Sequence, residues 1–475
     1  MNRAFPGRNV ILSGFVVFGT TGCVTTPAMQ QPNMDLPTNW RSADDSRAEL
    51  TPSVDNWWQR FGDTELEQLL IRALHANPDL QLATARLRIA QDTASIVAAQ
   101  RTPQISLGAG PVDPATTSAV KHTGVYSLGL RASYELDFWG RVGAEISSAS
   151  ALAHATADDA GTVLITLQRQ VAGHYFLVHA LDESLALQAQ QIALAKQTVD
   201  LARLRLGAGY SNENPLLDAE AAVAAARAEL GRQQRARAAV AMELALLLGE
   251  SPEQLELPVK TLTKHLRLPA VPATLPATVI DQRPDVAAAE HRLIAAHEDL
   301  AQARAALLPQ FSLSAEVGII TGPLQRLLGG RKAIIGVGPA VNYGLVDGGR
   351  GTAQIDAAQQ HREGAMASYR KAVLMALADV EQALTARDTA QEEHDRLVNA
   401  AAALRTRQQQ TAARIAAGRD TRFTQLAQQA QALDLQAQLV NNYRDQLDSA
   451  LSLYAALGGG WSTTDINVDR QTALP

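Results

Sequence analysis

Few residues of this 475-residue chain are spaced for catalysis or metal binding. Two histidines can hold a metal ion from one helix face when they lie three or four residues apart. His174 and His179 lie five apart, and no His-Glu-x-x-His motif occurs. His291 and His297 lie six apart, and the glycines at 336–338 lack the rest of a dinucleotide fingerprint. We therefore expect no enzyme, no metal site and no dissociable cofactor.

Cys23 is the only cysteine, so it has no partner for a disulfide within the chain. It follows Arg3, Arg8, an apolar run at residues 10–18 and a stretch of glycine and threonine at 19–22. A charged start, a short apolar run and small residues at a cleavage point are the layout of a secretory signal. The run is too short to span a bilayer. We expect a signal peptide at residues 1–22.

The Gly-Cys ending of this segment resembles the bacterial lipobox, whose cysteine is lipidated and becomes the mature N-terminus. Thr20 departs from the leucine that lipoboxes usually carry at that position. Val24 follows Cys23, so no aspartate stands there to retain the protein in the inner membrane. The resemblance implies a covalent lipid such as palmitate on Cys23. The alternative is a free or buried cysteine in a secreted protein.

The composition favours long helices over a bulky globular core. Hydrophobic residues make up 46 % of the chain but aromatic residues only 4 %. Small apolar residues at helical spacing suit long, closely packed helices. The net charge of −6 provides no basic stripe for a nucleic acid, so we expect no such partner.

The chain is a tandem duplication. The sequence Asn-Pro-Asp-Leu at 77–80 recurs as Arg-Pro-Asp-Val at 283–286, 206 positions later, and Pro-Gln-Ile-Ser-Leu at 103–107 recurs as Pro-Gln-Phe-Ser-Leu at 309–313, at the same offset. Further matches follow at an offset of 209: Tyr134 with Tyr343, Arg205 with Arg414, Gly209 with Gly418, and Gly249 with Gly458. Such a long period indicates two whole structural units, not a solenoid.

Each half contains two segments in which apolar and polar residues alternate strictly, the pattern of β-strands. We expect strands near 104–110, 125–138, 310–320 and 334–346. Their length suffices to cross a bilayer at a tilt, although the pattern alone also fits a sheet on a soluble core. Four strands cannot close a membrane barrel, and open edges are not tolerated in lipid. Strands in the membrane therefore require several chains.

The remaining segments are predicted to be helical, because long stretches contain no proline and little glycine. Long helices are expected at about 142–207 and about 350–417. Each meets a glycine turn and is followed by another helix, at 216–248 and 422–457. The sequence thus predicts two long helical hairpins.

Five motifs occur in an order that is specific as a set. They are Trp57-Trp58 with Phe61 and Asp63, the turns at 77–79 and 283–285, the segment 134–141, the segment 347–350, and the segment 457–461. In this order they resemble the TolC-like outer-membrane factor family, in particular its lipoprotein (NodT-type) efflux branch. The resemblance covers nearly the whole mature chain.

The resemblance implies an α+β membrane protein with four strands and two long helical hairpins per chain. It implies a trimeric 12-stranded β-barrel continued by a 12-helix periplasmic α-barrel. Such a homotrimer is a passive channel-tunnel of a tripartite efflux pump in the outer membrane of a Gram-negative bacterium. It is anchored in outer-membrane lipid and extends into the periplasm. Its partners are a periplasmic membrane-fusion adaptor and an inner-membrane transporter.

The expected organisation follows the two repeats. After the signal peptide come a lipid-anchored extended segment, 23–63, and the first repeat, 64–256. A connection at 257–275, assigned to an equatorial region, leads to the second repeat, 276–461, and a C-terminal tail, 462–475.

By position, the resemblance assigns the hairpin tips to adaptor docking and to the periplasmic aperture. The tip residues are Arg205, Gly207, Gly209, Asp218, Arg414, Gly418, Arg419, Asp420 and Arg422. An acidic Leu-Asp-Ala at 217–219 narrows such pores and favours cations, whereas 426–428 reads Leu-Ala-Gln. Arg419, Asp420 and Arg422 are candidates for an ionic gate between neighbouring hairpins. The alternative for all these charges is an ordinary solvated helix end.

Two other functions stay open at this point. The exit duct of a type I protein-secretion system has the same architecture, although that branch usually lacks the lipid. A soluble periplasmic coiled-coil scaffold is the other, but it has no use for four strands of bilayer length. The exported compound, whether drug, aromatic acid or metal ion, cannot be inferred.

Overall fold

The computed structural model describes residues 40, 49–50, 56–111, 126–269, 272–273, 282–321, 332–459 and 461. The signal peptide, Cys23 and the C-terminal tail lie outside the described residues. The chain forms two compact units, and each draws on both halves of the duplication. A strand unit contains residues 100–144 and 300–355, and a helical unit contains 56–99, 145–299 and 356–459.

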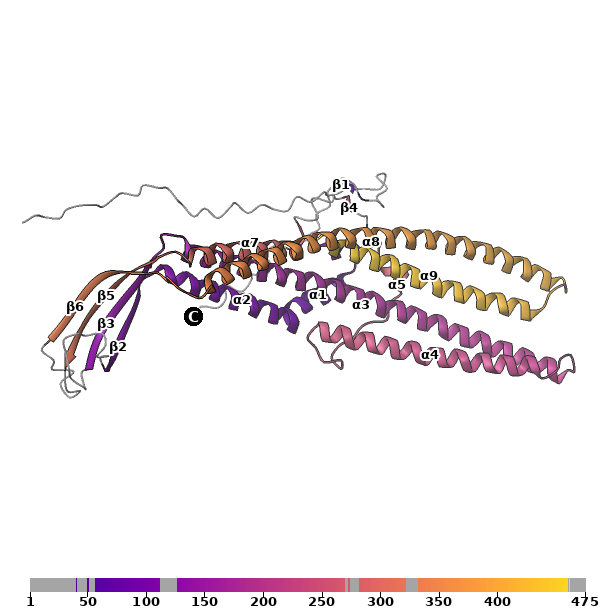
Figure 1. Cartoon of the computed structure of the whole chain (residues 1–475). Coiled ribbons are helices and arrows are strands. Elements are labelled where there is room, and N and C mark those ends of the chain that lie inside the picture. Colours follow the sequence, from indigo (N-terminus) through magenta and orange to yellow (C-terminus); the bar gives the residue numbers. More distant parts are fainter. Residues whose placement is uncertain are drawn as a thin grey trace, which may run out of the picture. The chain divides into compact units, whose positions relative to one another are not determined.

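The strand unit is one antiparallel sheet. Its strands are β2 (Gln104–Pro111), β3 (Tyr126–Leu136), β5 (Gln310–Thr321) and β6 (Lys332–Asn342), in the order β2-β3-β5-β6 (Figure 1). Gln104 lies opposite Ser133 in the β2–β3 ladder, and Gln310 lies opposite Asn342 in the β5–β6 ladder. The second pair repeats the first at the two sequence offsets of 206 and 209, so the duplication extends to the register of the strands.

One face of this sheet is apolar and exposed. Leu107, Leu130, Val317 and Ile335 form a row across the four strands, and all four are exposed in the single chain. Successive side chains of a strand point to opposite sides, and most residues that alternate with this row are small or polar. An alternating strand with an exposed apolar face is suited to lipid on that side.

Two strands end earlier than the alternation predicts. β3 ends at Leu136 because Asp137 turns away and accepts hydrogen bonds from the backbone N–H groups of Val142 and Gly143, at 3.0 and 2.7 Å. β6 ends at Asn342 because its partner strand begins at Gln310, directly opposite. Alternation continues to Leu345, but no residue of β5 is left to pair with it.

The helical unit is built on long hairpins (Figure 1). Its main helices are α1 (Thr64–Ala76), α2 (Pro78–Ala98), α3 (Arg141–Gly207), α4 (Asn214–Leu247), α7 (Pro284–Ala305), α8 (Arg350–Ala416) and α9 (Arg422–Ala456). Both α3 and α8 have 67 residues, which corresponds to roughly 100 Å at about 1.5 Å per residue. The hairpins α3–α4 and α8–α9 are those that the sequence predicts.

Shorter elements lie between these helices. They are β1 (Glu49–Leu50), η2 (Trp57–Phe61), η3 (Ala99–Arg101), α5 (Leu262–His265) and β4 (Pro272–Ala273). β1 pairs in parallel with β4, so the segment before α1 contacts the connection between the repeats. Among the described helices, none combines the length and the apolar character that crossing a membrane requires.

The main core of the helical unit contains a group of aromatic rings among its leucine, valine and alanine side chains. Trp57 stacks on Tyr454 with ring centroids 5.8 Å apart, and Phe61 packs against Phe176 at 5.2 Å. These rings fix η2 against α3 and α9. The Trp57 motif therefore belongs to the core.

Candidate functional site at the hairpin tips

The two hairpin turns have the same backbone geometry. In the first, the N–H of Tyr210 donates to the carbonyl of Arg205 at 2.9 Å, and Gly209 has a φ of +73°. In the second, the N–H of Arg419 donates to the carbonyl of Arg414 at 2.8 Å, and Gly418 has a φ of +68°. A glycine in the left-handed conformation with this hydrogen bond is a common helix C-cap, because it satisfies carbonyls that the helix leaves unpaired.

The second tip carries an ion pair within its own turn. Arg414 and Asp420 lie 3.2 Å apart on the two sides of Gly418. Hydrogen bonds from the side chain of Thr424 and the backbone of Thr421, together with Arg414, hold the pKa of Asp420 below its usual value. The carboxylate is thus charged and paired at neutral pH.

Arg419 and Arg422, the other two candidates for an ionic gate, are exposed. Arg422 contacts the side-chain oxygen of Gln425 in its own helix. Within one chain, Asp420 therefore pairs with neither of them. Its partner Arg414 was assigned to the tip from the sequence, but their pairing was missed. An arginine and an aspartate flanking a turn glycine are the signal that suggests it.

The first tip differs in its charges. Asp218 is exposed in α4, and its counterpart in α9 is the uncharged Ala427. Gly207 at the end of α3 is exposed, with open space around it. The nearby Glu220 is paired with Arg203 of α3 at 3.2 Å. Asp218 forms no ion pair with any other described residue.

One contact joins the two hairpins at their tips. The guanidinium carbon of Arg205 lies 5.2 Å from the ring centroid of Phe423, in the first turn of α9. A cation over an aromatic face contributes about 0.5–1 kcal/mol at an exposed site. Arg205 is among the tip residues expected from the sequence, whereas Phe423 is not.

Behind this contact lies an apolar groove of about 630 Å³ between α3, α4 and α9. Its lining includes Leu194, Ala219, Ala222, Phe423, Leu426 and Ala427. Small residues dominate, so a helix can approach the backbone closely there.

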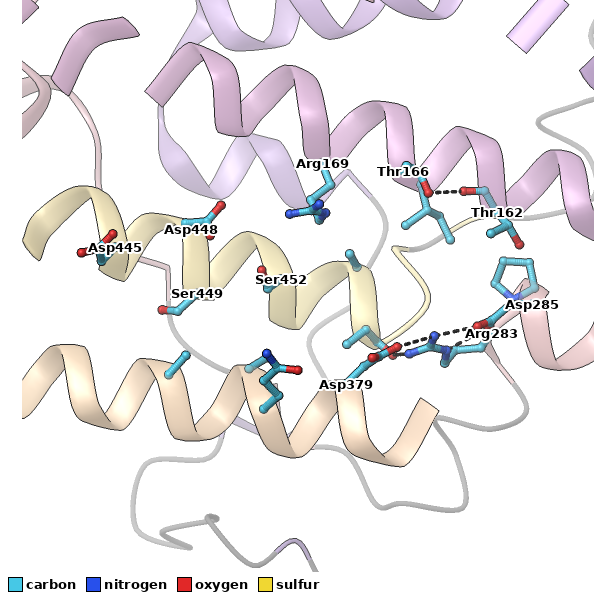
Figure 2. Close-up of a pocket in the computed structure, with 17 residues that line it drawn as sticks. Thr162, Thr166, Arg169, Arg283, Asp285, Asp379, Asp445, Asp448, Ser449 and Ser452 are labelled. Carbon is cyan, nitrogen blue, oxygen red and sulfur yellow. Dashed lines mark hydrogen bonds and ion pairs between the residues drawn. The ribbon is translucent and has the colours of Figure 1, made fainter. Parts of the chain in front are cut away.

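A second, polar cavity of about 660 Å³ lies between α3, α8, α9 and the start of α7 (Figure 2). Arg283 forms ion pairs there with Asp285 at 2.7 Å and Asp379 at 2.8 Å. Burial disfavours its charge, but these two carboxylates outweigh burial and raise the pKa of Arg283. Arg169 enters the cavity from α3 (Figure 2). The ion pairs tie α7 to α8, which is a structural role.

A buried polar cluster joins α1, α3 and the inter-repeat connection. The hydroxyl of Tyr175 donates to Asp63 at 2.7 Å, and Lys260 lies 2.5 Å from Glu65 and 3.4 Å from Asp63. Burial, followed by the hydrogen bond to Asp63, raises the pKa of Tyr175 far above its usual value. The tyrosine therefore stays protonated and cannot serve as a base. In the described part of the chain, no three histidine, cysteine or acidic side chains gather to hold a metal ion.

Together, the apolar sheet face and the long hairpins define the class of protein. The exposed apolar face suits a sheet in lipid, and hairpins of 67-residue helices suit a conduit wall that continues outside the membrane. The described residues of the tips form no catalytic arrangement. The molecule is an outer-membrane channel protein with a helical extension.

The outer membrane efflux protein family matches residues 69–250 and 275–459, and the chain belongs to this family. The two matched segments coincide with the two halves of the duplication.

Curated relatives match over almost their full length. The pyoverdine export outer membrane protein OpmQ of Pseudomonas aeruginosa is 31 % identical over 468 residues, covering 95 % of this chain and 97 % of that protein. The cation efflux system protein CusC of Escherichia coli O157:H7 is 27 % identical over 451 residues, covering 94 % and 97 %.

Among solved structures, the outer-membrane channel OprN has a TM-score of 0.81 at 28 % identity. It covers 92 % of this chain and 100 % of its own. These likenesses confirm the fold class, with strands for a β-barrel and hairpins for an α-barrel. The protein is an outer-membrane channel of a tripartite efflux pump, lies in the outer membrane and extends into the periplasm. It is a passive conduit, not an enzyme.

Proposed function

We propose that three copies of this chain close one efflux channel, and that the hairpin tips form its periplasmic aperture. A membrane-fusion adaptor docks at these tips and connects the channel to an inner-membrane transporter. The observation that carries the proposal is the repeated register of the sheet, whose outer strands β2 and β6 have the geometry to pair with each other across copies.

The duplication defines how these edges meet. Within the chain, β3 of the first half pairs with β5 of the second, with Ser133 opposite Ser314. The counterpart of Ser133 lies 209 positions later, at Asn342 of β6. The counterpart of Ser314 lies 206 positions earlier, at Gly108 of β2. We infer that β6 of one copy pairs with β2 of the next, with Asn342 opposite Gly108. Unpaired edges are not viable in lipid, which supports closure of this kind.

The helices support the same arrangement. Leu82, Ile89 and Ile96 repeat every seven residues along α2 and are 50, 65 and 72 % exposed. At the repeat offset, Leu82 and Ile89 correspond to Ala288 and Ala295 of α7, which are buried within the chain. The exposed stripe on α2 is where a neighbouring copy fits, because a large apolar stripe is stable only when covered. Three copies supply the twelve strands that the resemblance implies.

Cysteine cross-linking tests this register. The variant with Asn342→Cys and Gly108→Cys should form covalent species of two and three chains on a denaturing gel. Asn342→Cys with Gln104→Cys is the matched control, because it displaces one cysteine by four residues and should cross-link poorly. Ser133→Cys with Ser314→Cys should form a disulfide within one chain. Only monomers for the first pair, or a ladder beyond three chains, would contradict the proposal.

The aperture is proposed to be held closed by the tip contacts of each chain. The cation–π contact between Arg205 and Phe423 joins the hairpins, and the ion pair between Arg414 and Asp420 stiffens the second turn. Arg205→Ala and Arg414→Ala should each raise the single-channel conductance of the purified protein in a planar bilayer. The control is Arg232→Ala, which removes an ion pair with Glu229 farther along α4 from the tip. Equal conductance for all variants would show that the constriction does not lie at these tip contacts.

We further propose that residues 1–22 are removed and that Cys23 carries the lipid anchor. The charged, apolar and small-residue segments that precede Cys23 support this. Mass spectrometry of the mature chain tests it. A first residue other than a lipid-modified Cys23 would contradict it.

The channel is not the element that selects the exported compound. OpmQ is named for pyoverdine export and CusC for cation efflux, yet both resemble this chain over almost its full length. Such different cargo in proteins of one architecture supports selection by the transporter. If the transporter is replaced by another and this channel is kept, the identity of the exported compound should change.

A further inference from the structure

Two opposite charges face each other in the middle of the sheet. Arg131 of β3 lies directly opposite Glu316 of β5 in the antiparallel ladder, and their side chains approach to 3.5 Å. Both remain exposed in the single chain, at 67 and 45 %. An ion pair this exposed contributes little to stability, so stability does not account for it.

The pair lies on the polar face of the sheet and has small neighbours. Ser106 is opposite Arg131 on β2, and Gly336 is opposite Glu316 on β6. In the next row, Gly129 and Gly318 bring their backbones so close that a Cβ on Gly129 would lie 2.8 Å from the carbonyl oxygen of Val317. Arg131 and Glu316 therefore rise well above the surface around them.

These are the charges of the strand interiors. The four strands contain four charged residues, and the other two are Glu135 and Lys332. Glu135 stands near the end of β3 and is held by Arg141 at 2.8 Å. Lys332 is the first residue of β6. Arg131 and Glu316 thus set the charge of the polar face at mid-strand.

The face of the sheet that carries Arg131 and Glu316 is expected to face water. A charged side chain on the lipid side of a membrane strand costs about 2–4 kcal/mol at the bilayer midplane, whereas substitutions on the pore side alter selectivity. The apolar row through Leu130 and Val317 occupies the lipid side, so the opposite face lines the pore. Rings of charged side chains are a general means of selecting ions.

We propose that Arg131 and Glu316 balance the charge of the pore inside the barrel. In the three-copy channel, three such pairs form a belt. The belt has no net charge, so the barrel passes solutes of either sign. This inference rests on the proposed closure of the channel by three copies.

Charged thiol reagents added from the external side test the belt independently of the periplasmic aperture. Ser106→Cys places a reporter in the same row, and the ratio of its reaction rates with a cationic and an anionic reagent measures the local potential. Arg131→Gln should raise this ratio severalfold, and Glu316→Gln should lower it severalfold. The double variant should return it to the original value. Protein without the reporter gives the background of Cys23.

Two controls accompany the measurement. Leu107→Cys, on the lipid side of the same strand, should react slowly with both reagents in membranes. Ser133→Ala on the polar face should leave the ratio at Ser106→Cys unchanged.

A ratio that does not respond to either charge removal would overturn the proposal, and so would a shift of the same sign for both. A pair that only joins β3 to β5 would lower the heat resistance of the assembled channel without a sign-dependent change in the ratio. If Leu107→Cys reacts faster than Ser106→Cys, the faces are reversed and this inference fails alone. If cross-linking finds no assembly, the proposed closure fails with it.

Discussion

The guanidinium of Arg283, before the first turn of α7, donates to the carbonyl oxygen of Ala456 at the last residue of α9, at 3.2 Å. The first half has the same contact with another side chain. There the amide of Asn77 donates to the carbonyl of Leu247, the last residue of α4, at 2.9 Å. In both halves the side chain before a Pro-Asp turn satisfies a helix end, which would otherwise keep an unpaired carbonyl.

Removing Arg283 should be costly. Its side chain is 10 % exposed and holds Asp285, Asp379 and the end of α9. Because the substitution breaks both ion pairs and leaves the carbonyl of Ala456 without this donor, Arg283→Ala should lower the free energy of unfolding by about 2–4 kcal/mol. Arg283→Lys should recover only part of this, since lysine lacks the planar fork. Thermal unfolding in detergent, followed by the helical circular dichroism signal, measures both.

The control for Arg283 is Arg292→Ala. Arg292 pairs with Asp159, and both side chains are about half exposed, at 48 and 46 %. Its removal should cost about 0–1 kcal/mol. Equal losses for Arg283→Ala and Arg292→Ala would contradict a role for Arg283 in joining three helices.

Gly458 should not tolerate a side chain. Its φ is +96°, and an added Cβ would lie 2.5 Å from the carbonyl oxygen of Gln282. Gly418 has a φ of +68° with open space around it, so Gly418→Ala should cost only the backbone strain of about 1–2 kcal/mol. Gly458→Ala adds a collision with backbone and should lower the unfolding midpoint further. A smaller drop for Gly458→Ala than for Gly418→Ala would rule out this close packing.

His179 should make the helical unit sensitive to acid. Its ring is buried against Tyr175 at 4.4 Å between centroids, and neither ring nitrogen has a hydrogen-bond partner among the residues that the structure describes. Burial lowers the pKa of His179 from its ordinary 6.5, although Asp182 acts in the opposite sense. Below about pH 6.5 the unfolded chain binds a proton that the folded chain does not. Stability should therefore fall as the pH drops through this range, by up to about 1.4 kcal/mol per pH unit.

The variant His179→Phe should remove this part of the acid sensitivity, because phenylalanine has nothing to protonate. The unfolding midpoint measured between about pH 8 and about pH 5 should fall less steeply than that of the original protein. His361→Gln, at an exposed position of α8, should change nothing. An unaltered slope for His179→Phe would assign the acid sensitivity to other groups.

Asp218 should give the periplasmic end of the pore a preference for cations. It is exposed and has no ion pair among the described residues, whereas Glu220 is paired with Arg203. Asp218→Asn should lower the ratio of potassium to chloride permeability severalfold, measured from reversal potentials in a salt gradient. Glu220→Gln serves as the matched control, with a smaller effect. If Glu220→Gln has the larger effect, Asp218 does not line the aperture.

The sequence alone determined the class of protein and its plan. Strict alternation over four segments predicted the strands, and two long stretches without proline predicted the hairpins. Both signals are local, because the face of a strand or the length of a helix depends on neighbouring residues. The duplication was equally visible, since equal spacing of matched residues such as Gly209 and Gly418 needs no structure. The family that these motifs resemble was confirmed for the chain.

Only the tertiary structure decided which distant residues meet. β3 ends where Asp137 turns to accept hydrogen bonds from Val142 and Gly143, and β6 ends opposite the first residue of β5, so alternation overestimated both strands. The guanidinium of Arg205 packs over the ring of Phe423 in the other hairpin, a contact that no sequence spacing indicates. The partner of Asp420 is Arg414, although three arginines stand near it in sequence. Such choices arise from packing between elements far apart in the chain, and a local pattern carries no information about it.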